Sequence, residues 1–194
     1  MLVALEGSSP TISGENNYKY YVWDVYRDTL QSPKIYKEGP AAVSWGPSPI
    51  NIRKMADAAT GFIRRNSGPI FLIGWSRGAA ACIQVALDLN RGNYANNIEG
   101  MFLFDAVDQD GSTSDFLNYV PGNVTNCYHA IATKKSWADR QLFPTCGRTW
   151  HGSVNMVTKN FNTSHGGIAG TAGDDGDAGS REWMWGHLRR HGVL

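Results

Sequence analysis

Residues 70–79 of the chain read Ile70-Phe71-Leu72-Ile73-Gly74-Trp75-Ser76-Arg77-Gly78-Ala79. The uninterrupted apolar run at the start of this segment predicts a strand that is covered on both faces. The alanine-rich stretch from Arg77 to Leu89 is apolar almost all round and predicts a buried helix. Between them stands the pattern Gly-x-Ser-x-Gly, which carries a nucleophilic serine when it lies at a strand-to-helix turn. We therefore predict that Ser76 is a nucleophile.

The residue types around this serine suit its chemistry. Gly74 and Gly78 would let the strand, the turn and the helix pack closely. The start of a helix also brings N–H groups and positive partial charge to a developing oxyanion, so the amide of Arg77 is expected to be one donor of an oxyanion hole. The second donor is expected from the turn after the first predicted strand, where Gly7 and Ser8 remain alternatives.

A serine hydroxyl needs a base, and several histidines follow the predicted turn. In this type of site the chain order is serine, acid, histidine. His165 stands in a glycine-rich loop after the last predicted strand and is the favoured base, with His151 as the alternative. His129 falls in an apolar strand pattern and is expected in the core. His187 and His191 fall in the terminal helix and are expected on its solvated face.

The acid that orients the histidine is expected at the end of a strand that follows the serine. Asp105 comes directly after the apolar run that ends at Phe104, so its carboxylate would reach the same edge of the sheet as the serine. Asp108 is the near alternative, and Asp139 is the alternative after the next strand. We favour Asp105.

Strand and helix patterns alternate along the chain. Further strands are predicted over residues 2–5, 20–23, 98–104, 124–131 and 149–157, and further helices over residues 50–65 and 181–190. Such alternation predicts crossover connections, a mostly parallel central sheet and helices on its faces. Together with the serine motif it predicts one α/β-hydrolase-like domain over residues 1–194.

Aromatic residues stand beside the predicted nucleophile and in the segment before it, and some are expected to line the site. Trp75, beside the predicted nucleophile, is expected to bind substrate as a wall of the acyl pocket. Residues 8–50 are rich in Tyr, Pro, Gly and Trp, including Trp23 and Trp45, and are expected to form a partial cover over the site.

Composition excludes several classes of function. With 18 Lys and Arg against 17 Asp and Glu, the net charge of +1 gives no field for nucleic acid. Three cysteines at unrelated spacings and an acidic run at 174–177 match no metal-binding pattern, so no metal is expected. No cofactor is expected either, because a serine nucleophile with its base and acid needs none. No membrane-spanning run and no signal-peptide pattern are present, which favours a cytoplasmic protein, with signal-independent export left open. The oligomeric state cannot be read from the sequence.

Several motifs resemble, in order, those of a bacterial α/β-hydrolase family that includes the phospholipase effectors of type VI secretion. They are Glu6-Gly7-Ser8, where the family has Asp-Gly-Thr, then Gly74 to Ala79, Asp105-Ala106-Val107, His165-Gly166-Gly167, and Glu182-Trp183-Met184. The resemblance implies a minimal single-domain relative with an esterase-like or lipase-like catalytic set. The acidic residue that the family carries shortly after its histidine is absent here.

The sequence therefore predicts a serine hydrolase that cleaves a small-molecule or lipid carboxylic ester through an acyl-enzyme. An acyltransferase or thioesterase would use the same residues. A catalytically silent binding protein on the same scaffold is the alternative of another class, and a histidine or acid out of reach of Ser76 would favour it.

Overall fold

The computed structural model describes residues 1–8, 20–40, 50–109, 111–134, 144–171 and 176–194. Its centre is a six-stranded sheet in which every described pair of neighbouring strands is parallel. In spatial order the strands are β2 (Lys34–Lys37), β1 (Leu2–Leu5), β3 (Ile70–Trp75), β4 (Ile98–Phe104), β6 (Val124–Ala132) and β8 (Asn155–Phe161). A small second sheet pairs β5 (Tyr119–Val120) with β7 (Thr149–Trp150).

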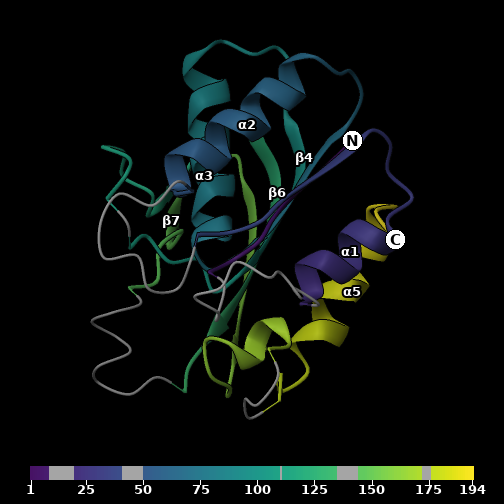
Figure 1. Cartoon of the computed structure of the whole chain (residues 1–194), viewed down its shortest axis with the longest axis vertical. Helices are drawn as coiled ribbons and strands as arrows, with labels where there is room; N and C mark the ends of the chain where they lie inside the picture. Colours follow the sequence, from purple (N-terminus) through teal and green to yellow (C-terminus); the bar gives the residue numbers. More distant parts are fainter. Residues whose placement is uncertain (9–19, 41–49, 110, 135–143, 172–175) are drawn as a thin grey trace.

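Helices cover both faces of the central sheet (Figure 1). On one face lie α2 (Ile52–Arg64) and α3 (Arg77–Arg91). On the other lie α1 (Tyr21–Asp28), α5 (Ser180–Arg190) and the short 3₁₀ helix η1 (Gly167–Ala169). The apolar strands serve both faces by alternation: on β4, Met101 and Leu103 pack toward α2 and α3, while Phe102 and Phe104 pack toward the opposite layer.

The strand order places a switch point between β1 and β3. From β1 the chain passes to β2 at one edge, whereas β3 leads to β4, β6 and β8 on the other side. In doubly wound sheets a crevice opens outside the carboxyl ends of the strands at such a point, and ligands bind there. The turn after β1 and the turn after β3 are therefore the first places to look for a site.

This architecture confirms the predicted α/β-hydrolase-like fold with a mostly parallel central sheet, flanking helices and a single domain. The predicted helices and strands at 50–65, 77–89, 98–104, 124–131 and 181–190 are found as α2, α3, β4, β6 and α5, and the strand at 2–5 as β1.

Two expectations for local structure were wrong, and one strand was not predicted. The segment 20–23 begins helix α1 instead of forming a strand, and α1 buries Val22 and Val25, which are spaced three residues apart. The predicted strand 149–157 is two strands, because a turn closed by the amide of Val154 on the carbonyl of His151 separates β7 from β8. Strand β2 was not predicted, because its sequence, Lys-Ile-Tyr-Lys, is short and carries charges.

The partial cover expected over residues 8–50 falls only partly on described residues. Of its described residues, Tyr21–Asp28 form α1 in the helical layer and Lys34–Lys37 form β2 in the sheet, and the cover itself stays a prediction. There Trp23 packs against Tyr26 and Tyr36. Residues 9–19 and 41–49, with Trp45, lie outside the described residues.

No described helix is both long enough and apolar enough to cross a membrane. The side chains of Cys82, Cys127 and Cys146 are all buried, and no disulfide joins them.

Candidate active site

Ser76 occupies the sharp turn between β3 and α3. Its φ of 55° and ψ of −125° are unusual for a residue with a side chain and persist only where the surroundings hold them. Here its amide donates to the carbonyl of Phe104 at 3.0 Å, and its carbonyl accepts from Ala80 and Val107 at 3.1 Å each. The backbone of Ser76 is thus fixed by β4, by α3 and by the segment after β4.

The two glycines of the motif are required by close packing. A Cβ at Gly74 would lie 2.6 Å from the backbone of Gly78, and a Cβ at Gly78 would lie 2.1 Å from the carbonyl oxygen of Leu5. Any side chain at either position would push α3 away from the sheet. The motif therefore fits a turn that brings β1, β3 and α3 into contact.

His165 lies within hydrogen-bond distance of both Ser76 and Asp105. Its Nε2 is 2.9 Å from Ser76 Oγ, and its Nδ1 is 2.6 Å from Asp105 Oδ2. With the proton on Nδ1 donated to the carboxylate, Nε2 is left to accept the serine proton. The structure thus brings together the three residues that the sequence singled out as nucleophile, acid and base.

Asp105 directly follows β4 and is fully buried. Its amide donates to the carbonyl of Ala130 at 2.7 Å, which ties the turn to β6. Besides His165, its carboxylate receives contacts at 3.4 Å from the amide of Ala132 and the hydroxyl of Thr145. These contacts come from different segments and hold the carboxylate in one orientation.

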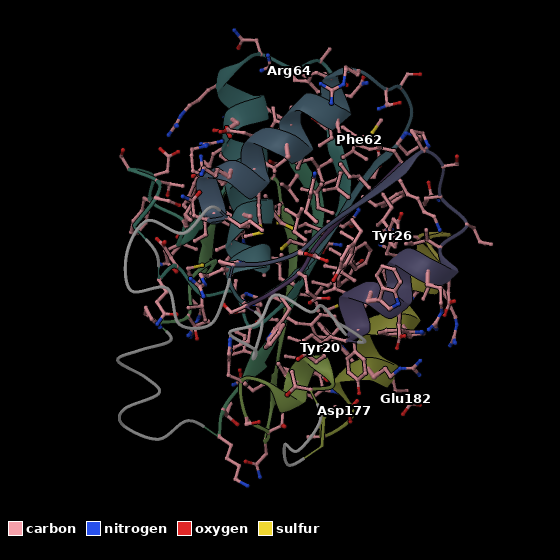
Figure 2. The ribbon with its side chains drawn as sticks, viewed as in Figure 1. Tyr20, Tyr26, Phe62, Arg64, Asp177 and Glu182 are labelled. Carbon is pink, nitrogen blue, oxygen red and sulfur yellow. The ribbon has the colours of Figure 1, made fainter. Side chains whose placement is uncertain are left out.

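The loop that carries His165 is held by Trp75. The indole Nε1 donates to the carbonyl of His165 at 3.0 Å, and the two rings lie 5.5 Å apart. Tyr20, labelled near the start of α1 in Figure 2, packs edge-on against the indole at 5.3 Å. Trp75 is 5% exposed, and its indole supports the histidine loop. The expectation that Trp75 forms a wall of an acyl pocket stays a prediction.

The turn after β1, which we call the β1 loop (Glu6, Gly7 and Ser8), packs beside the serine turn. A Cβ at Gly7 would lie 2.3 Å from the ring of Trp75, so only glycine fits there. The amide of Gly7 donates to Oε1 of Glu6 at 3.2 Å. Ser8 Oγ accepts from the guanidinium of Arg77, with Nε at 2.8 Å. Both expected sources of the second oxyanion donor therefore lie next to the helix that follows the nucleophile.

Glu6 was not recognised as a site residue from the sequence. It is fully buried, and Tyr36 donates its hydroxyl to Oε2 at 3.2 Å. Burial raises the pKa of Glu6 to about 8, against the opposing effect of the hydrogen bonds from Gly7, Tyr36 and the backbone of Trp23. An acidic residue directly after a buried strand was the available signal.

The other histidines lie apart from this arrangement. His129 is buried as expected and accepts from the amide of Ala106 at 3.1 Å, and His151 is exposed beside Ser153. The expectation for His187 was wrong: it is 6% exposed and stacks on Tyr128, because α5 turns this side toward β6. His191, placed on the solvated face by the sequence, instead contacts the hydroxyl of Tyr128 through Nε2 at 2.8 Å.

Asp108 and Asp139 were the alternatives to Asp105 as the acid that orients the histidine. Nδ1 of His165 contacts the carboxylate of Asp105, so Asp105 and not Asp108 occupies the place of the orienting acid. Asp139 lies outside the described residues, as do Asp174 and Asp175. Within the described ranges no group of three or more His, Cys, Asp or Glu side chains could hold a metal ion. Asp177, the described end of the acidic run, accepts instead from the hydroxyl of Tyr21 at 2.9 Å (Figure 2 labels Asp177).

A hollow of about 400 Å³ lies between β2 and α2. Its lining combines apolar side chains of α2 with Tyr36, Lys37 and Glu38 from the end of β2. Tyr36 thus belongs both to this hollow and to the contact with Glu6.

No protein-family model matches the sequence, and no characterised protein sequence matches it either. Among solved structures, the fold is similar to the Vlm2 thioesterase domain with genetically encoded 2,3-diaminopropionic acid bound with a dodecadepsipeptide. That comparison has a TM-score of 0.54 at 12% identity and covers 100% of this chain and 94% of the other. The same domain in space group H3 gives a TM-score of 0.47 at 13% identity, with 100% and 93% covered. The NocB thioesterase domain in covalent complex with a fluorophosphonate nocardicin G analog gives 0.42 at 12% identity, with 80% and 81% covered. At these identities the likeness concerns the fold alone, and the first comparison supports the α/β-hydrolase-like architecture of this chain.

Proposed function

We propose that this protein is a serine hydrolase that cleaves carboxylic esters through an acyl-enzyme. The observation that carries the proposal is the line of contacts from Ser76 Oγ to His165 Nε2 at 2.9 Å and from His165 Nδ1 to Asp105 at 2.6 Å. These distances lie in the range that a nucleophile, its base and the orienting acid need.

In the first step Ser76 Oγ attacks the ester carbonyl carbon while His165 Nε2 takes the hydroxyl proton. The negative charge moves to the carbonyl oxygen, which the amide of Arg77 and an amide of the β1 loop stabilise. Asp105 stabilises the imidazolium. As the carbon–oxygen bond to the leaving group breaks, His165 returns the proton to the departing alcohol.

In the second step a water molecule attacks the acyl-enzyme. His165 takes a proton from the water, and the tetrahedral intermediate collapses with release of the acid. The proton on His165 returns to Ser76 Oγ. Atoms and charges balance without any further group.

The second oxyanion donor is assigned to the amide of Ser8. Two facts support this choice: the amide of Gly7 is engaged by Glu6, and among the described residues no acceptor is bonded to the amide of Ser8. Arg77 favours one position of Ser8 through its contact with the hydroxyl.

A thioesterase or acyltransferase is the second candidate, because it would use the same residues and the similar Vlm2 structure is a thioesterase domain. A relation to the bacterial family with type VI secretion phospholipase effectors rests on the sequence motifs alone. The rival hypothesis of a silent binding protein required a histidine or acid out of reach of Ser76, and neither contact distance favours it.

The test is chemical labelling. A fluorophosphonate probe should modify the protein at Ser76, as located by peptide mass spectrometry, and S76A should lose both labelling and hydrolysis of short p-nitrophenyl esters. S153A, which removes an exposed serine outside the site, is the matched control and should behave as wild type. Hydrolysis of esters and thioesters that share one acyl group ranks the two candidates. Normal ester turnover in S76A would end the proposal.

A further inference from the structure

Glu6 is a buried acidic residue at the point where β1 meets the proposed oxyanion loop. Its side chain has no exposed surface, and its own backbone is closely packed: a Cβ at Gly78 of α3 would lie 2.5 Å from the carbonyl oxygen of Glu6. A carboxyl group is costly to bury in ionised form unless cations or several donors surround it. A buried glutamate at this position therefore calls for an explanation.

The contacts of Glu6 show what it holds. Oε1 accepts from the amide of Gly7, Oε2 accepts from the hydroxyl of Tyr36 on β2, and the backbone of Trp23 on α1 also donates to the carboxyl group. The first contact turns the Gly7 amide toward the carboxyl group and leaves the next amide of the β1 loop as the donor that we assign to the oxyanion hole. The second contact ties the carboxyl group to the neighbouring strand. The geometry of the loop thus depends on Glu6.

The charged and titratable groups that face Glu6 come from three elements. Tyr36 on β2 donates its hydroxyl, and Asp24 on α1 adds a repulsive negative charge. Arg77 on α3 contacts Ser8, two residues further along the chain, through its guanidinium. Strand β3, which also flanks β1, contributes no titratable group. No cation contacts the carboxyl group directly among the described residues.

We propose that Glu6 is a positioning residue that acts in its neutral form, holding the β1 loop for oxyanion stabilisation, and that its ionisation switches the site off. This inference rests on the proposed function. In the neutral form Oε1 still accepts from Gly7, and the acid proton on Oε2 can be donated to Tyr36 Oη. In the ionised form a negative charge stands beside the loop whose amide must stabilise a second negative charge, and repulsion raises the barrier.

The direction of the pH effect follows from burial. Because burial raises the pKa of Glu6 to about 8, the residue is neutral below that pH and ionises above it. Activity should therefore fall as the pH rises through about 8, by tenfold per unit beyond it. A serine, histidine and aspartate alone give no loss in this range, because a histidine base stays neutral there.

The experiment measures the rate of fluorophosphonate labelling of Ser76 from about pH 6 to about pH 10 in wild type, E6Q, Y36F and E182Q. Gln keeps the acceptor for the Gly7 amide but cannot ionise, so E6Q should lose the alkaline decline. Y36F removes a donor that favours the ionised form, so the decline should move to higher pH. E182Q changes an exposed glutamate of α5 and should retain the wild-type profile.

A decline near pH 8 that persists in E6Q overturns the inference, and so does a wild-type profile that is flat to about pH 10. Should E6Q fail to fold, the shift in Y36F decides alone, and an unshifted decline overturns the inference. If wild type is not labelled at Ser76 at any pH, the proposed function itself has failed. A labelled wild type without the Glu6-dependent decline leaves that function standing.

Discussion

At the scale of single residues, the candidate site depends on how Asp105 holds His165. The carboxylate is buried and lies 2.6 Å from Nδ1, so it can stabilise only the tautomer that leaves Nε2 ready to accept the Ser76 proton. Loss of this contact is expected to cost much of the activity without loss of the fold.

Asp105→Asn should therefore lower kcat by about 10⁴, because an amide can favour the wrong tautomer of the histidine. The measurement is ester hydrolysis at neutral pH, with the melting temperature as a check on folding. Asp108→Asn is the matched control and should retain near wild-type turnover. The reverse ranking would move the orienting acid to Asp108.

A second prediction at this scale concerns Trp75. Trp75→Phe keeps an aromatic ring against Gly7 but removes the Nε1 donor to the His165 carbonyl. A hydrogen bond of this kind contributes about 1 kcal/mol, so kcat should fall on the order of fivefold as the histidine loop loosens. KM should change little, because the buried indole contacts protein and has almost no surface for substrate. A rise in KM with unchanged kcat would support the acyl-wall interpretation.

At the residue scale, local patterns in the sequence singled out side chains that the structure brings together. Ser76 stood between an apolar strand and an apolar helix, and His165 stood in a glycine-rich loop after the last strand. The surroundings of Glu6 could not be predicted in this way, because Tyr36, which contacts its carboxyl group, and Gly78, which packs on its backbone, are distant in sequence. The support that Trp75 gives to the His165 loop could not be predicted for the same reason: its neighbours Tyr20 and His165 come from other segments.

At the scale of elements, α5 shows how tertiary packing decides which side of a helix is buried. His187 stacks on Tyr128 of β6 at 3.9 Å and meets Trp183 edge-on at 4.6 Å. Neither ring nitrogen of His187 has a hydrogen-bond partner within the described parts of the chain. Burial lowers the pKa of His187 to about 4, with a further contribution from Arg190.

This packing predicts that acid weakens the attachment of α5. As the pH falls below about 6.5, the histidine takes up a proton in the unfolded chain but not in the folded one, so stability is lost until about pH 4. The melting temperature of wild type should fall between about pH 7 and pH 5 more than that of H187F, by about 2–4 °C for each kcal/mol. H151Q, which removes an exposed histidine, should follow wild type. Parallel curves for wild type and H187F would contradict the prediction.

Two elements, α1 and β2, differ from what the sequence pattern predicted. Tyr20 to Trp23 carries residues that favour strands, yet Val22 and Val25 pack one helical face against the sheet, and tertiary packing overrode the local preference. Strand β2 lies at the sheet edge, where a four-residue segment with two lysines needs no apolar pattern.

At the scale of the whole molecule, one parallel sheet joins all the segments that build the site. Its architecture was predictable because long apolar runs alternate with helical patterns, which leaves few topologies. Burial of the neutral Glu6 carboxyl group should make the free energy of unfolding of the whole domain depend on pH. Glu6 is ionised in the unfolded chain above about pH 4.5, but in the folded chain only above about pH 8.

Between those values each pH unit should cost wild type up to about 1.4 kcal/mol, because the unfolded state releases a proton that the folded state retains. Gln cannot ionise, so the free energy of unfolding of E6Q should not show this loss. The advantage of E6Q in the free energy of unfolding by urea should therefore grow from about pH 5 to about pH 8 and then level off. A constant difference between E6Q and wild type across this range would show that Glu6 does not titrate as inferred.

The ribosome synthesises the proposed base, His165, well after the proposed nucleophile, Ser76. His165 lies 89 residues after Ser76, beyond β8, and the two meet only when β8 has joined β6. A growing chain on the ribosome that has emerged as far as β6 already holds the serine turn and Asp105 but has no base. If His165 is the base, as proposed, such an unfinished chain should not react with a fluorophosphonate, and reactivity should require the segment that follows β8.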